Sequence, residues 1–302
     1  MTHIRVAHSP DSDDAFMFWA MVEGLVDTEG LEFSHHLADI ETLNQEAKRG
    51  TYELTAISYF AYPFVADKYN LLTCGSSVGN KYGPVVVAKE KLHRLDLEHK
   101  PIAVPGELTT AYLALKVWMP QAQTVVVPFD QIMDKVKDGT YAAGVIIHEG
   151  QLTYPQEGLQ KVVDLGEWWF EEANLPLPLG GNAIRADLDH DTQLKVARVL
   201  KRSIEYGLAH RQQAMDYAKQ FSQGLPQDKM DRFIGMYVND HTVEADLEVQ
   251  KAVRLLLFRG HAIGLLPEKP VIEFISPEGT GVPFKGGEFP AEATKVELPF
   301  QV

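Results

Sequence analysis

The first 185 residues alternate between strand signals and helix signals, and this order restricts the fold more than any other feature. Short apolar or alternating runs predict strands at residues 4–8, 31–37, 52–57, 84–88, 101–104, 124–127 and 142–147. Capped, periodic segments between them predict helices at 12–23, 40–49, 58–67, 108–118 and 129–137. Such alternation is typical of mostly parallel sheets with helices on both faces.

The pattern changes after a predicted strand at 162–165, a short helix at 166–172 and an extended return at 177–185. Apolar residues then recur every three or four positions, which predicts amphipathic helices around 194–208, 214–221, 230–237 and 252–257. The chain after Pro267 is rich in proline and glycine, so we expect an irregular surface tail.

One topology accounts for this order: an α/β fold of two lobes with a ligand cleft between them. Lobe I would combine residues 1–92 with the returning segment 188–302, and lobe II, residues 98–185, would be inserted in it. The connections near 90–98 and 183–190 would then act as hinges. Clefts between lobes are common places for small ligands.

Composition narrows the possible partners. The chain has 302 residues, 45% of them hydrophobic, which is ample for a core. Its formal net charge of −14 disfavours nucleic acid and anionic membrane surfaces, so we expect a small-molecule ligand. A single cysteine, Cys74, excludes an intrachain disulfide and a thiolate metal cluster. The first residues enter a strand without a secretory pattern, which predicts a cytoplasmic protein.

The predicted strand at 142–147 is followed directly by His148 and Glu149. Ligands of open α/β sheets lie outside the carboxyl ends of the strands, and an imidazole there can accept a proton near neutral pH. His148 is therefore the candidate general base. The alternative is a structural histidine that satisfies a turn, which is the commoner role of a lone histidine.

Two other strand ends carry hydroxyl groups. Thr55 and Ser58 lie at the first, and Thr109 and Thr110 follow Gly106 at the second. The hydroxyls and the free amides of a helix start suit a carboxylate or a phenolate. Gly106 allows a close backbone approach. Simple helix capping, with Ser58 as an N-cap, is the alternative interpretation.

The segment from Ser9 to Asp14 opens the first helix, and we favour a well-capped helix start there because its aspartates would oppose an anionic ligand. No nucleotide-binding glycine loop and no His-Glu-x-x-His motif occurs. The adjacent His35 and His36 would point to opposite faces of a strand. We therefore expect neither a metal nor a cofactor.

Many segments together resemble the menaquinone-biosynthesis proteins of the futalosine pathway, and among them the 1,4-dihydroxy-6-naphthoate synthase family. The matching segments run in order over most of the chain up to about residue 260. They are Ser9-Pro10 with Asp14 and Phe16, Asp39 to Asn44, Leu54-Thr55 with Ser58-Tyr59, Gly83 to Ala88, Val104 to Gly106 with Thr109 to Tyr112, Ile146 to Glu149, Thr153 to Pro155, Val162 to Gly166, Leu175 to Gly180, Arg202-Ser203, Ala209-His210 and Tyr237 to Asn239.

The resemblance implies a fold like that of periplasmic solute-binding proteins, used in the cytoplasm by an enzyme. It implies a lyase that splits cyclic dehypoxanthine futalosine, an anionic small molecule, to 1,4-dihydroxy-6-naphthoate without metal or redox cofactor. It places the general base at His148. The substrate contacts that it implies, together with Thr109 from the hydroxyl argument above, are Thr55, Ala56, Ile57, Ser58, Thr109, Thr110 and Ala111.

The sequence departs from the family pattern at two places near the predicted cleft. Asp11-Ser12-Asp13 stands where the family has Cys-Pro-Asn, and Ala56 stands where it has a lysine. Two other functions stay open at this point. One is a solute-binding protein for a small organic acid, and the other is the chorismate dehydratase of the same pathway.

Overall fold

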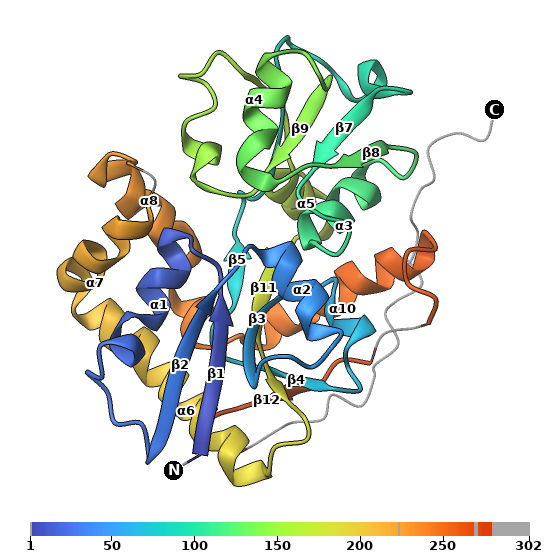
Figure 1. Cartoon of the computed structure of the whole chain (residues 1–302). Coiled ribbons are helices and arrows are strands. Elements are labelled where there is room, and N and C mark those ends of the chain that lie inside the picture. The colour runs from blue at the N-terminus through green and yellow to red at the C-terminus, as the bar shows by residue number, and fades with distance from the viewer. Residues whose placement is uncertain (1, 223, 269–270, 280–302) are drawn as a thin grey trace.

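The computed structural model describes residues 2–222, 224–268 and 271–279, and it contains two β-sheets, one above the other in Figure 1. The larger sheet has seven strands in the order β12-β4-β11-β3-β1-β2, with β5 paired to β11, and the smaller has five in the order β10-β6-β9-β7-β8. We call the larger sheet with its helices lobe I and the smaller sheet with its helices lobe II. The two-lobed α/β prediction is confirmed.

The strands of lobe I are β1 (Thr2–His8), β2 (Leu31–Leu37), β3 (Leu54–Ser58), β4 (Tyr69–Leu72), β5 (Ser77–Gly79), β11 (Leu177–Arg185) and β12 (Phe274–Ile275). Those of lobe II are β6 (Val85–Ala88), β7 (Pro101–Val104), β8 (Gln123–Val126), β9 (Ala143–Ile146) and β10 (Gln160–Asp164). Every residue of β3, β6 and β9 is buried, because both faces of these strands are covered.

The α-helices are α1 (Ser12–Val22), α2 (Ile40–Ala47), α3 (Thr110–Trp118), α4 (Ile132–Lys137), α5 (Leu165–Ala173), α6 (His190–Ala209), α7 (Arg211–Ala218), α8 (Gln227–Tyr237), α9 (Asp240–Val243) and α10 (Leu247–Ala262). Short 3-10 helices lie at η1 (Tyr62–Phe64), η2 (Arg94–Leu97), η3 (Phe129–Gln131), η4 (Glu149–Leu152) and η5 (Lys219–Phe221).

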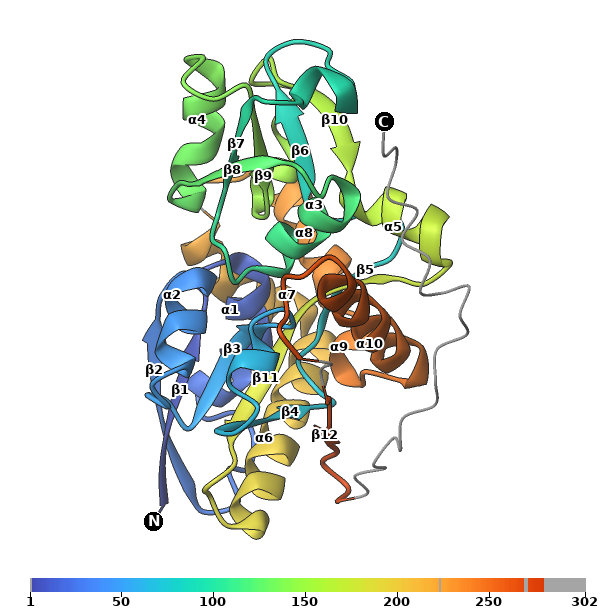
Figure 2. The ribbon, with the colours of Figure 1, turned by 90° about the vertical axis from the view of Figure 1, so that its right-hand side faces the viewer.

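Helix α1 packs against α6, α7 and α8, and the apolar side chains of these helices form one core cluster with those of β1 and β3. Helix α2 lies against β3. Helix α10 packs against β11 and also against α3 of lobe II, so it touches both lobes (Figure 2). The late amphipathic helices therefore return to lobe I, as the topology requires.

The sheets are mixed rather than mostly parallel. β1 runs parallel to β2 and β3, and β7 runs parallel to β8 and β9, as expected for strands joined by helices. However, β11 runs antiparallel to β3, β4 and β5, and β6 runs antiparallel to β9 and β10. Both β6 and β11 are strands that the chain enters on arriving from the other lobe, without a crossover helix in the same sheet.

The two sheets divide the chain at points other than those predicted. β6 already belongs to the sheet of lobe II, and β11 already belongs to that of lobe I. The chain therefore crosses between sheets at 80–84 and again after α5, at 174–176, not near 90–98 and 183–190. The two crossings lie side by side on lobe I, since Gly79 at the end of β5 pairs with Leu177 at the start of β11. Bending at these crossings stays a prediction.

Two further expectations change. The predicted helix at 58–67 is wrong, because β3 runs on to Ser58 and only the short η1 follows, at Pro63, whose missing N–H cannot continue an α-helix. The sequence analysis also missed the short β4 and β5. Of the predicted tail, residues 274–275 form β12 beside β4, whereas residues 280–302 lie outside the described residues. No helix in the described part is long and apolar enough to cross a membrane.

Candidate active site

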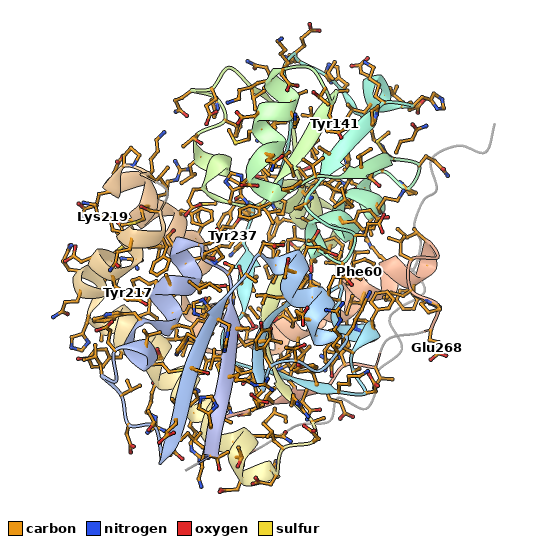
Figure 3. All side chains as sticks on the ribbon, viewed as in Figure 1. Phe60, Tyr141, Tyr217, Lys219, Tyr237 and Glu268 are labelled. Carbon is orange, nitrogen blue, oxygen red and sulfur yellow. The ribbon has the colours of Figure 1, made fainter. Side chains whose placement is uncertain are left out.

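A cavity lies between the lobes and encloses about 790 Å³, open solvent included. The loop from β1 to α1, the end of β3 and the middle of β11 form its lobe I wall, and the start of α3 with Ile147 forms its lobe II wall. Tyr237, at the end of α8, lies between the lobes (Figure 3) and also lines the cavity. Six predicted binding residues are on these walls: Ala56, Ile57, Ser58, Thr109, Thr110 and Ala111.

The start of α3 offers hydrogen-bond donors to the cavity. Thr109 is the N-cap of α3: its hydroxyl accepts from the Tyr112 amide over 3.2 Å and donates to the Gly106 carbonyl over 2.8 Å. The next two residues, Thr110 and Ala111, carry the first amides of the helix, which have no carbonyl one turn earlier to bind. These amides and the helix dipole favour an anion at this wall.

The end of β3 forms the opposite wall. Asn44 of α2 holds Ser58, because its side-chain amide donates to the Ser58 hydroxyl over 3.0 Å and its oxygen accepts from the Ser58 amide over 2.9 Å. Ser58 therefore does not cap a helix, and the capping alternative is wrong there. Thr55 is fully buried, donates to the Ala56 carbonyl over 2.9 Å and is not on the cavity wall.

Gly106 marks a close approach between the lobes. A Cβ atom on Gly106 would lie 2.2 Å from Oε2 of Glu41, which belongs to α2 of lobe I. The same carboxylate oxygen accepts from the Leu108 amide over 3.1 Å. The predicted close approach at Gly106 is confirmed, and the group that approaches is a side chain of the other lobe.

Other hydrogen bonds also join the lobes around the cavity. The Ser12 hydroxyl donates to Oε1 of Glu149 over 2.8 Å, and both side chains are buried. The Tyr237 hydroxyl donates to the side-chain oxygen of Gln151 over 2.7 Å. Thr110 accepts from the Phe60 amide over 3.1 Å. Together with the Glu41 contact, these bonds hold the lobes in a closed arrangement.

Three aspartates stand on the lobe I wall, where the sequence analysis expected only a capped helix start. Asp11 is the N-cap residue of α1, but its side chain caps no amide of the helix. Burial raises the pKa of Asp11 to about 7 and that of Asp14 to about 6, and neighbouring carboxylates add to the rise at Asp11. Burial also raises the pKa of Asp13. The group therefore retains protons near neutral pH, which weakens its repulsion of an anionic ligand.

His148 lies beside the cavity but does not line it; its neighbour Ile147 does. The ring packs edge-on against Phe129, with centroids 5.6 Å apart, and Nδ1 accepts from the Gly150 amide over 3.0 Å at the start of η4. Nε2 is buried with no hydrogen-bond partner among the described residues. Burial lowers the pKa of His148 below its ordinary 6.5, so the ring is neutral at pH 7.

Sequence reasoning missed several wall residues. Asn182, from the middle of β11, and Tyr237 line the cavity beside Asp11 and Asp13. The sequence of the return at 177–185 gave no sign that β11 would insert between β3 and β4, and that insertion brings Asn182 to the wall. Within the described residues, no group of three or more His, Cys, Asp or Glu side chains is placed to hold a metal ion.

Comparison with solved structures defines the fold class first. The alkanesulfonate-binding protein of Xanthomonas axonopodis pv. citri superimposes on the chain with a TM-score of 0.70 at 14% identity, covering 90% of this chain and 96% of that one. The architecture is thus the two-lobed one of solute-binding proteins. A solved protein of Archaeoglobus fulgidus is nearer, with a TM-score of 0.84 at 48% identity over 87% of this chain and 98% of that chain.

Sequence comparison then gives the family. The profile described as menaquinone biosynthesis matches residues 4–262. A 1,4-dihydroxy-6-naphtoate synthase of Thermus thermophilus is 38% identical over 270 residues, which are 89% of this chain and 98% of the relative. The chain belongs to the menaquinone biosynthesis family.

Proposed function

We propose that this protein is a 1,4-dihydroxy-6-naphthoate synthase, a carbon–carbon lyase that acts on cyclic dehypoxanthine futalosine. The observation that carries the proposal is the 38% identity, over nearly the full length of both chains, to a relative of that name. The inter-lobe cavity agrees with it, because its walls combine apolar side chains with hydroxyl groups and the amides of a helix start, as small-molecule sites do. The single cysteine, buried and free, and the biosynthetic relatives favour the cytoplasm as its place of action.

In this proposal the start of α3 binds the anionic end of the substrate. The amides of Thr110 and Ala111 supply N–H donors at the positive end of the helix, and the Thr110 hydroxyl lies beside them. The Ser58 hydroxyl, held by Asn44, faces this group across the cavity. Fixed donors of this kind stabilise negative charge that develops as the bond breaks.

His148 is the proposed proton acceptor, and its position sets a condition on that role. While Nδ1 accepts from the Gly150 amide, the proton of the neutral ring is on Nε2. The ring can accept a substrate proton only after it releases this amide, and it must also turn into the cavity, which it does not line. The lowered pKa keeps the ring neutral at pH 7, as a base requires.

The test is turnover of cyclic dehypoxanthine futalosine by the wild type and by His148→Asn. We expect kcat of the variant to fall by about 100-fold to 10,000-fold, the usual contribution of a general base. Wild-type kcat/KM should decline on the acid side with a pKa below 6.5, because burial disfavours the charged ring. His210→Asn, at the partly buried junction of α6 and α7, is the matched control.

Two results would contradict the proposal. Unchanged turnover in His148→Asn would remove His148 from the mechanism while leaving the reaction intact. A wild type that binds small organic acids tightly but releases no 1,4-dihydroxy-6-naphthoate would favour a solute-binding role instead.

A further inference from the structure

Asn182 carries an unused hydrogen-bond acceptor on the cavity wall. The residue is 1% exposed, and its side-chain nitrogen donates to the Gly75 carbonyl over 3.1 Å. This bond fixes which amide atom is oxygen, because only the nitrogen can donate. That oxygen, Oδ1, has no partner among the described residues. Leaving a buried acceptor unpaired is unfavourable, so such a group on a ligand cavity calls for a donor from the ligand.

Asp11, on the same wall, also has a buried side-chain oxygen without a hydrogen-bond partner among the described residues. Its Oδ2 accepts from the Ser9 hydroxyl over 3.0 Å, whereas Oδ1 is buried with no partner in the described part of the chain. Asp13 and Asp14 line the cavity beside it. The lobe I wall thus presents acceptors, in contrast to the donors at the start of α3.

Ligand chemistry follows from the charges around this wall. No lysine, arginine or histidine lines the cavity within the described residues. Burial raises the pKa of Asp11 to about 7, so the carboxylate form that accepts at Oδ1 is well populated at pH 7, and it raises that of Asp14 to about 6. A ligand group rich in O–H donors fits such a wall, because its two unpaired oxygens, Oδ1 of Asn182 and Oδ1 of Asp11, each accept one hydrogen bond.

We propose that Asn182 and Asp11 form a hydroxyl-recognition subsite, which selects ligands that carry a carboxylate at one end and aliphatic, sugar-like hydroxyls at the other. The carboxylate binds at the start of α3, and the hydroxyls donate to Oδ1 of Asn182 and Oδ1 of Asp11. This inference rests on the proposed function for the identity of the natural substrate, but not for the chemistry of the subsite.

The experiment measures binding by calorimetry at pH 7 with three ring acids: quinate, which carries hydroxyls, cyclohexanecarboxylate, which has none, and trans-4-(aminomethyl)cyclohexanecarboxylate, which carries an ammonium group. We expect the wild type to bind quinate tighter than cyclohexanecarboxylate by about tenfold or more, the worth of one or two hydrogen bonds to buried acceptors. Asn182→Leu and Asp11→Ala should each lose most of this preference while still binding cyclohexanecarboxylate.

Asp246→Ala, which is not on the cavity wall, is the control and should keep the wild-type preference. If Asn182→Leu does not fold, Asp11→Ala, in a loop, decides the question alone. Equal binding of quinate and cyclohexanecarboxylate by the wild type, or an unchanged preference in the variants, would overturn the subsite. Tighter binding of the ammonium acid would overturn it too.

Turnover separates this inference from the proposed function. If the wild type converts cyclic dehypoxanthine futalosine, the Asn182→Leu variant should raise KM about tenfold while inhibition by the product 1,4-dihydroxy-6-naphthoate, which has no aliphatic hydroxyl, stays the same. If the wild type does not convert cyclic dehypoxanthine futalosine, the proposed function fails. The calorimetric comparison of the three ring acids still tests the subsite in that case.

Discussion

At the scale of single residues, the sequence predicts a close approach at Gly106 but not the residue that approaches it. A glycine at this position allows a close approach to its backbone, but only the fold shows that the close neighbour is the side chain of Glu41 from the other lobe. His148 is the converse case. Its place at a strand end is visible in the sequence, whereas its bond to the Gly150 amide depends on the turn into η4.

Gly106→Ala should therefore hinder closure of the lobes. The added Cβ would lie 2.2 Å from Oε2 of Glu41, so the side chain or the lobes must move apart. Overpacking of this kind costs about 1–3 kcal/mol, which predicts a KM raised about 5-fold to 150-fold with a smaller change in kcat. Steady-state kinetics measures both.

The double variant Gly106→Ala with Glu41→Ala should recover most of the lost KM, because the obstructing carboxylate is gone. Gly235→Ala is the control, since its Cβ would meet only a flexible arginine end at 3.4 Å. A double variant no better than Gly106→Ala would show that the effect does not come from the contact with Glu41.

His8 gives a prediction about pH and stability. Its ring is 3% exposed, stacks on Phe18 at 4.3 Å, and burial lowers its pKa to about 4 from 6.5. The unfolded chain binds this proton below pH 6.5 but the fold does not, so stability is lost as pH falls from 6.5 toward 4.

His8→Phe keeps the stacking and removes the titration. Its Tm relative to the wild type should therefore rise as pH is lowered from 7.5 to 4.5, by an amount corresponding to about 2 kcal/mol. Thermal unfolding followed by circular dichroism at both pH values measures it. A difference that does not change with pH would refute the assignment.

At the scale of elements, segments with strong local signals are the ones that the sequence predicted well. β2 (Leu31–Leu37) and β11 (Leu177–Arg185) have the predicted bounds, and the four late amphipathic helices all form. The short β4 and β5 were missed because three or four residues give no clear periodicity. Their strand character comes from pairing with β11, which lies about 100 residues later.

The N-cap of α10 offers a test at this scale. Oδ1 of Asp246 accepts from the Val249 amide over 2.9 Å and satisfies one of the free amides of the helix start. Asp246→Ala should lower the free energy of unfolding by about 1 kcal/mol, and Asp246→Asn should keep most of it. Chemical denaturation measures the difference, and equal losses in both variants would argue against capping.

At the scale of the whole molecule, the two-lobed α/β plan followed from the order of elements, but the division of the chain did not. Local signals say that a strand forms, not which sheet it joins, so β6 and β11 were assigned to the wrong lobes. The cavity walls could be predicted only in part, because local signals do not show which sheet a strand joins. The α3 and β3 walls lie at strand ends that the sequence shows, whereas Asn182 arrives from β11 through long-range pairing.

The position of β11 between β3 and β4 has a consequence for the order in which the protein can form during synthesis. β1, β2, β3 and β4 leave the ribosome early, but the strand that joins β3 to β4 follows only after the whole smaller sheet has been made. Lobe II, whose strands all lie between residues 85 and 164, can thus become structured on the growing chain while the earlier-made lobe still waits for its central strand.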